Sequence, residues 1–172
     1  MTTKHEKYLK VCSMIRDIIQ KSKDLEKVYE SELSQVHPIF KKSAANLLHY
    51  MAFRSFDIDQ LQLELKSLGL PSLSTIESHV MRSLFNLQNI LHHLVGFEEV
   101  ASPKGYVSVK KSNRIMRKNS KLLFGFKSKK RRTRIMVTLP NYAADDQVFV
   151  QKLISQGMNC ARINCAHDDP EI

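Results

Sequence analysis

The chain has 172 residues, and its 27 Lys and Arg against 17 Asp and Glu give a formal net charge of +10. This length suffices for one good hydrophobic core, or for one small domain plus part of another. The apolar runs are far shorter than the roughly 20 residues of a spanning helix, and no signal peptide is recognisable, so we expect no membrane partner. The three Cys, at positions 12, 160 and 165, have no metal-ligand spacing, and their odd number favours a reducing, cytoplasmic location.

The first part of the chain has the periodicity of amphipathic helices. Apolar residues recur three and four apart over residues 5–33, which predicts a first helix. A second helix is predicted over residues 43–53, with Leu47 and Met51 on its apolar side and His49 packed inside the domain.

Two further helices follow after short connections. Asp57 is a predicted N-cap, and Gly69 is the predicted end of the third helix, because glycine accepts the left-handed conformation that closes a helix. Ser74 to Glu77 has the capping-box pattern and is predicted to open a fourth helix that ends near Val95. Residues 1–99 are therefore predicted to form an α-helical bundle domain.

The excess positive charge lies in one segment. Residues 1–99 contain 12 basic and 12 acidic side chains, whereas residues 104–134 contain 13 basic and no acidic ones. We interpret residues 100–131 as a basic linker, in preference to a site for a phosphorylated ligand, an acidic partner or nucleic acid. No nucleic-acid-binding motif accompanies the charge, so nucleic acid is not an expected partner. Two apolar stretches, residues 106–109 and 122–126, indicate an edge hairpin or a docking segment.

The most informative pattern lies near the end, where residues 157–169 read GMNCARINCAHDD. Gly157 is predicted to end a helix, and a strand follows that we expect to be buried on both faces. Arg162 and Asn164 share one side of that strand, and His167 lies in the loop after it. An Arg with neighbouring polar groups at a strand end suits an anionic or phosphorylated ligand.

This segment resembles the second barrel strand of the pyruvate kinase family, G-M-N-x-A-R-x-N-x-S-H. Residues 132–140, RTRIMVTLP, resemble the family's first strand, R-x-T-x-I-x-x-T-I-G-P, and residues 145–156 resemble the helix between them. Residues 43–50 and 68–74 are also similar to a helical extension found at the N-terminus of some longer bacterial pyruvate-kinase-like proteins. The glycine of T-I-G-P is absent here, where residues 138–141 read TLPN.

The resemblance implies a mainly α chain in which the helical bundle precedes the first β-α-β unit of a (β/α)₈ barrel, within residues 132–172. A complete barrel needs about 250 residues, so the barrel is expected to be incomplete here, and the chain is expected to be part of a longer protein. The implied activity is glycolytic phosphoryl transfer from phosphoenolpyruvate to ADP, giving pyruvate and ATP with Mg²⁺ or Mn²⁺. The family's catalytic Lys and acidic metal ligands would follow Ile172, so this chain alone is expected to be inactive.

The resemblance also assigns roles to individual residues. Arg162 would bind the transferring phosphoryl group, and His167 would border the nucleotide. Asn164 would support a K⁺ site, at which Ala166 replaces the family's serine and removes one hydroxyl ligand. The alternative function is a non-catalytic helical binding or regulatory module whose basic segment meets an anionic partner. The resemblance is also compatible with a homo-oligomeric longer protein.

Overall fold

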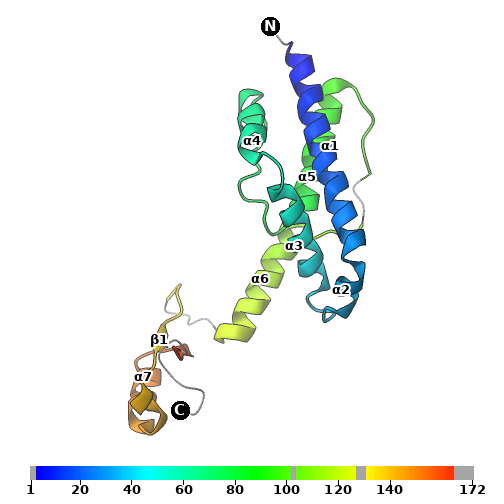
Figure 1. Cartoon of the computed structure of the whole chain (residues 1–172). Helices are drawn as coiled ribbons and strands as arrows, with labels where there is room; N and C mark the ends of the chain where they lie inside the picture. The colour runs from blue at the N-terminus through cyan, green and yellow to red at the C-terminus, as the bar shows by residue number, and fades with distance from the viewer. Residues whose placement is uncertain (1–2, 102–103, 127–130, 165–172) are drawn as a thin grey trace. The chain divides into compact units, whose positions relative to one another are not determined.

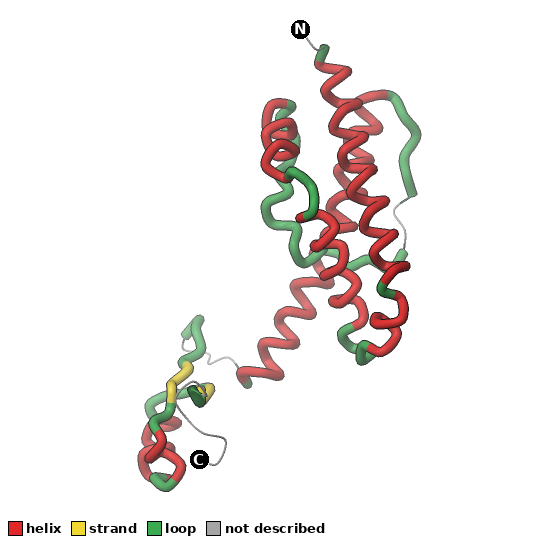
Figure 2. Tube along the Cα trace, in the orientation of Figure 1, coloured by secondary structure: helices red, strands yellow, loops and turns green. Residues whose placement is uncertain are grey.

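The computed structural model describes residues 3–101, 104–126 and 131–164, and these are mainly helical. The chain divides into two compact units, Met1–Asn113 and Arg114–Ile172, which we call the helical unit and the β-α-β unit. Figure 1 labels the α-helices and strand β1, and Figure 2 shows how short the strands are beside the helices. No helix within the described ranges is both long and apolar enough to cross a bilayer.

The first helix, α1 (Lys4–Val28), begins at a capping box. Thr3 Oγ1 accepts the Glu6 N–H at 3.2 Å, and the Glu6 carboxylate accepts the Thr3 N–H at 2.6 Å. These bonds satisfy donors that have no partner inside the helix. A break at Tyr29 separates α1 from the short α2 (Glu30–Gln35), so the predicted first helix forms in two pieces. The residues that α1 buries follow the predicted spacing: Val11, Cys12, Ile15, Ile18, Ile19 and Ser22.

Helix α3 (Lys41–Arg54) confirms the second predicted helix, but it buries a different side. Leu47 and Met51 are 57% and 51% exposed, whereas His49 and Phe53 are buried. The predicted side was wrong because α3 carries apolar residues around most of its circumference, so their spacing does not select one face. The packing partners α1 and α5 make that selection.

Two helix boundaries agree with the sequence prediction. Asp57 caps α4 (Ile58–Ser67), because its Oδ1 accepts the Gln60 N–H at 3.0 Å. Gly69 follows the end of α4 with a φ of 71°, the left-handed conformation that glycine accepts without strain, and its N–H donates to the Lys66 carbonyl at 3.1 Å.

The start of α5 (Val80–Val95) differs from the prediction. The expected capping box at residues 74–77 does not open a helix, and the chain turns until Val80. Asn46 of α3 caps α5 instead: its Oδ1 accepts the Val80 N–H at 3.0 Å, and its Nδ2 donates to the Glu77 carbonyl at 2.6 Å. A side chain from another helix therefore sets this boundary.

The core of the helical unit lies where α1, α3 and α5 pack side by side (Figure 1). Leu84 and Leu91 of α5 are fully buried there, and Phe85 is 2% exposed. Burying an aliphatic or aromatic side chain of this size contributes about 1.5–3 kcal/mol. Helix α4 packs against α1 and adds Leu61 and Leu65 to the same core.

The segment interpreted as a basic linker contains a helix, α6 (Val109–Phe124). Before α6 begins, Val107 is buried, and the Tyr106 ring stacks on Phe85 with centroids 6.0 Å apart. Residues 122–124 are the last part of α6, so the suggested edge hairpin does not form within the described residues. The physical reason is composition: residues 106–124 have no Gly or Pro, and the Lys, Arg, Met and Leu residues among them favour helix.

The second unit has the predicted strand-helix-strand order. Met136 pairs with Cys160, and Thr138 pairs with Arg162, in a two-stranded parallel sheet. The elements in chain order are β1 (Met136–Thr138), the 3₁₀ helix η1 (Asn141–Ala144), α7 (Gln147–Ser155) and β2 (Cys160–Arg162). A barrel needs more strands than this pair, so the assignment of this unit as the start of a barrel stays a prediction.

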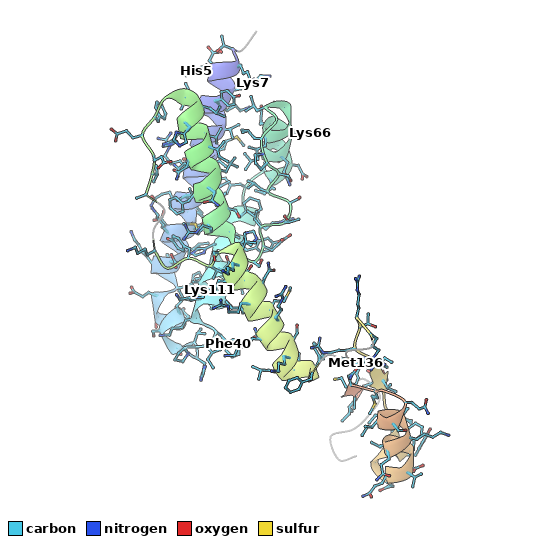
Figure 3. All side chains as sticks on the ribbon, turned by 180° about the vertical axis from the view of Figure 1, so that it is seen from behind. His5, Lys7, Phe40, Lys66, Lys111 and Met136 are labelled. Carbon is cyan, nitrogen blue, oxygen red and sulfur yellow. The ribbon has the colours of Figure 1, made fainter. Side chains whose placement is uncertain are left out.

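The strand pair is more exposed than the sequence predicted. Met136, labelled in Figure 3, is 49% exposed, and Ile163 is 70% exposed. The expectation that the second strand is buried on both faces was therefore wrong for this chain. A lone strand pair with one short helix has too few neighbours to cover both of its faces.

Candidate functional site

The candidate site lies where the two parallel strands end. Thr138 is the last residue of β1, and Arg162 is the last residue of β2. Their pairing in the sheet places both side chains at the carboxyl edge. The Leu139 N–H donates to the Arg162 carbonyl at 3.0 Å, so the backbone holds the two strand ends together.

The Arg162 guanidinium is held by neutral oxygen atoms. Its Nη1 donates to Thr138 Oγ1 at 3.1 Å, and its Nη2 donates to Asn164 Oδ1 at 3.3 Å. Within the described parts of the chain, no carboxylate lies within ion-pair distance of Arg162. Among the described residues, the exposed guanidinium is therefore held by neutral oxygen atoms alone, and an arginine in such surroundings suits a phosphate or carboxylate ligand.

Two of the predicted site residues come together here. Arg162 and Asn164 are in direct contact, because Asn164 Oδ1 accepts a hydrogen bond from Arg162 Nη2; the K⁺ role of Asn164 stays a prediction. His167 and Ala166 lie outside the described residues. Sequence reasoning missed Thr138, although its position at the end of the first predicted strand was a usable signal.

A second cluster holds the amino ends of the strands in register. Arg131 Nη2 donates to the Gly157 carbonyl and, at 2.7 Å, to Asn159 Oδ1. The same Asn159 oxygen accepts the Ile135 N–H at 3.0 Å, which connects the start of β1 to the start of β2. Gly157 has a φ of 102°, and a Cβ added there would lie 3.0 Å from Arg131 Nη1. The backbone conformation therefore favours glycine here, and a side chain would also have to displace the Arg131 guanidinium slightly.

The described residues do not supply the divalent-metal site that the resemblance implies. No group of three or more His, Cys, Asp or Glu side chains suited to a metal ion occurs among them. Asp146, the acidic residue nearest in sequence to α7, is used as that helix's cap and accepts the Phe149 N–H at 2.8 Å.

Comparison of the chain with protein-family models, curated proteins and solved structures finds no match in any of the three. The similarity to pyruvate kinase consequently depends on the sequence patterns alone.

The helical unit contains a separate cavity of about 550 Å³ beside a buried histidine. As predicted, His49 lies inside the unit and is only 2% exposed. Its Nε2 is 3.3 Å from Glu26 Oε2, and its ring meets Tyr106 edge-on, with centroids 5.3 Å apart. Three lysines and two glutamates line the same cavity, so its charges are mixed and do not indicate one class of ligand: Lys41, Lys42, Lys104, Glu26 and Glu30.

Burial lowers the pKa of His49 below its ordinary value of 6.5, because desolvation outweighs the attraction of the Glu26 carboxylate. The folded state then binds a proton less readily than the unfolded state. We therefore expect the free energy of unfolding to fall as the pH drops below about 6.5, because unfolding lets His49 take up a proton. Urea denaturation across this pH range measures the effect.

The matched comparison for this prediction uses two histidines. His49→Gln should flatten the pH dependence of stability, whereas the exposed His5→Gln should leave it unchanged. Equal slopes for wild type and His49→Gln would show that His49 does not control acid stability.

Proposed function

We propose that this chain contributes the opening β-α-β unit of a pyruvate-kinase-like phosphotransferase, which converts phosphoenolpyruvate and ADP to pyruvate and ATP. The observation that carries the proposal is the Arg162 guanidinium, held at the carboxyl edge of two parallel strands by Thr138 and Asn164. Barrel enzymes place their active sites at this edge. The choice of this particular reaction depends on the resemblance of the sequence around Arg162 to the pyruvate kinase motif.

In this proposal, Arg162 binds oxygen atoms of the transferring phosphoryl group. Phosphoryl transfer depends on positioning and on neutralising negative charge, and an Arg fork does both. Thr138 and Asn164 fix the fork by accepting one hydrogen bond each. A bound Mg²⁺ or Mn²⁺ would add charge neutralisation, from acidic ligands that the resemblance expects after Ile172. His167 would border the nucleotide.

The proposal is tested on a longer protein that carries this chain together with a complete barrel. We expect pyruvate formation from phosphoenolpyruvate and ADP that requires a divalent metal, measured by coupling pyruvate to lactate dehydrogenase. A folded, longer protein that binds neither substrate and forms no pyruvate would contradict the proposal. The sequence after Ile172 offers an independent check, because the proposal requires a Lys and a Glu–Asp metal pair at later strand ends.

The 172-residue chain by itself should show no turnover in the same assay. The described residues hold no divalent-metal site, and they form one strand pair where a barrel needs eight strands. The measurement requires a preparation shown to be free of host pyruvate kinase. Metal-dependent turnover above the blank in that preparation would disprove this expectation.

A second candidate function is a non-catalytic binding module with a basic segment for an anionic partner. It is favoured by α6, which carries six Lys and Arg residues and no acidic residue within Val109–Phe124. The two candidates are compatible within one longer protein, since they use different residues.

A further inference from the structure

Helix α6 separates its basic side chains from its apolar ones. Arg114, Arg117, Lys118 and Lys121 fall within roughly one third of the helix circumference at 3.6 residues per turn. Met116 and Leu123 are two turns apart and lie on another side. Figure 3 draws the side chains along α6 and labels Lys111 in its first turns.

The apolar side of α6 is exposed to solvent. We call Met116, Leu122, Leu123 and Phe126 the α6 apolar stripe; they are 62%, 73%, 72% and 77% exposed, respectively. Met116 and Leu123 lie opposite the basic side chains, Leu122 lies between the two sides, and Phe126 follows the end of the helix. Single exposed apolar side chains are ordinary, but four large ones within eleven residues, three of them on one amphipathic helix, indicate a surface that binds a partner. The partner must accept both this stripe and the adjacent cations.

At the end of α6, an apolar side chain and a basic side chain are in contact. Gly125 has a φ of 71° and ends α6, so Phe126 is the first residue after the turn. The Lys121 ammonium lies 4.1 Å from the centroid of the Phe126 ring. A ring and a cation held together in this way suit a boundary where apolar and charged groups are adjacent.

We propose that α6 binds the surface of an anionic lipid bilayer, lying in the plane of the headgroups. Helices of this kind bury Leu, Met and Phe side chains at the acyl boundary and direct Lys and Arg to anionic headgroups. The contact does not need a spanning helix, so it is compatible with the lack of one in the described ranges. It departs from our sequence-based expectation of no membrane partner, which considered spanning segments only.

Nucleic acid and an acidic protein are the two other anionic partners to consider, and each explains fewer features of α6 than a bilayer does. Nucleic acid would attract the cations but would leave the apolar stripe in water, because phosphate contacts use basic groups. An acidic protein groove would bury the stripe, but it needs a shaped cleft that matches particular side chains. A bilayer accepts all four residues of the stripe and the basic side chains together, without such a match.

Co-sedimentation of the 172-residue chain with vesicles tests the proposal. The chain should bind vesicles of equal parts phosphatidylcholine and phosphatidylserine and should not bind phosphatidylcholine alone. Arg114→Gln with Lys118→Gln should weaken binding about 30-fold, because each cation near an anionic surface contributes about 1 kcal/mol. Met116→Gln and Leu123→Gln should each weaken it about tenfold through lost apolar burial.

Matched controls separate the surface of α6 from general effects. Leu63→Gln changes another leucine that is 62% exposed, and Lys21→Gln with Lys27→Gln removes two exposed charges from α1; both should bind vesicles like wild type. Circular dichroism should show unchanged helix content in every variant. The proposal makes no use of Arg162, so its failure would leave the phosphotransferase proposal unaffected.

Four outcomes would overturn it. The first is no binding to anionic vesicles, and the second is wild-type binding by the Met116→Gln and Leu123→Gln variants. The third is binding to duplex nucleic acid that is tighter than vesicle binding and is unaffected by those two substitutions. The fourth is loss of vesicle binding in a longer protein that includes α6. The last outcome would mean that the rest of that protein covers the stripe. Anionic-vesicle binding that weakens in both sets of α6 variants, but in neither control, would support it.

Discussion

Replacing Arg162 with alanine in a longer, complete-barrel protein should lower kcat by about 10²–10³, with little change in melting temperature. Loss of one charge-stabilising donor from a preorganised site typically costs a factor of this size. Arg162 is exposed, and among the described residues its side chain is hydrogen-bonded to Thr138 and Asn164 alone, so we expect little packing to be lost with it. Arg162→Lys should recover only part of the rate, because an ammonium group cannot reproduce the planar fork.

Measuring turnover and melting temperature on the same samples separates catalysis from structure. Arg54→Ala is a matched control, because it removes another exposed arginine, from α3, and should change neither quantity. If Arg162 only stabilises the strand pair, Arg162→Ala would lower the melting temperature while the folded fraction kept wild-type turnover. That result would remove the observation on which the proposed function depends.

Replacing Leu84 with alanine should destabilise the helical unit by about 2–5 kcal/mol. Leu84 is fully buried at the centre of α5, and truncation of such a residue loses both transfer free energy and packing around the cavity it leaves. A loss of this size is a large fraction of the 5–15 kcal/mol typical of a folded domain. Leu63→Ala, at a leucine that is 62% exposed, should change stability by no more than about 0.5 kcal/mol.

Hydrogen exchange locates the effect of Leu84→Ala within the chain. In the wild type, amides of α1, α3 and α5 should be the best protected, because these helices enclose the core, and amides of β1 and β2 should exchange faster. The variant should lose protection throughout the helical unit and leave the strands nearly unchanged. Slow strand amides together with fast amides in the first helices would contradict the division into a stable helical unit and a weaker β-α-β unit.

The sequence by itself determined the elements whose signals are local. Asp57 caps α4 because its side chain reaches the Gln60 N–H three residues away, and Gly69 closes the same helix because only a few neighbouring residues decide that turn. The strand-helix-strand order of the second unit was predicted from the resemblance of its segments to the pyruvate kinase family, which is also a comparison of short local patterns. Arg162 and Asn164 could be paired from sequence, since side chains two residues apart in a strand lie on the same side.

Only the tertiary structure decided the features that depend on distant residues. The start of α5 follows from Asn46, thirty-four positions before Val80, and no local pattern predicts that bond. The buried side of α3 follows from its contacts with α1 and α5, because its own sequence is apolar on several sides. The contact between Thr138 and Arg162 also depends on distant residues. The parallel pairing of β1 and β2 brings together two strand ends that a helix separates in sequence, and this pairing forms only when the chain folds.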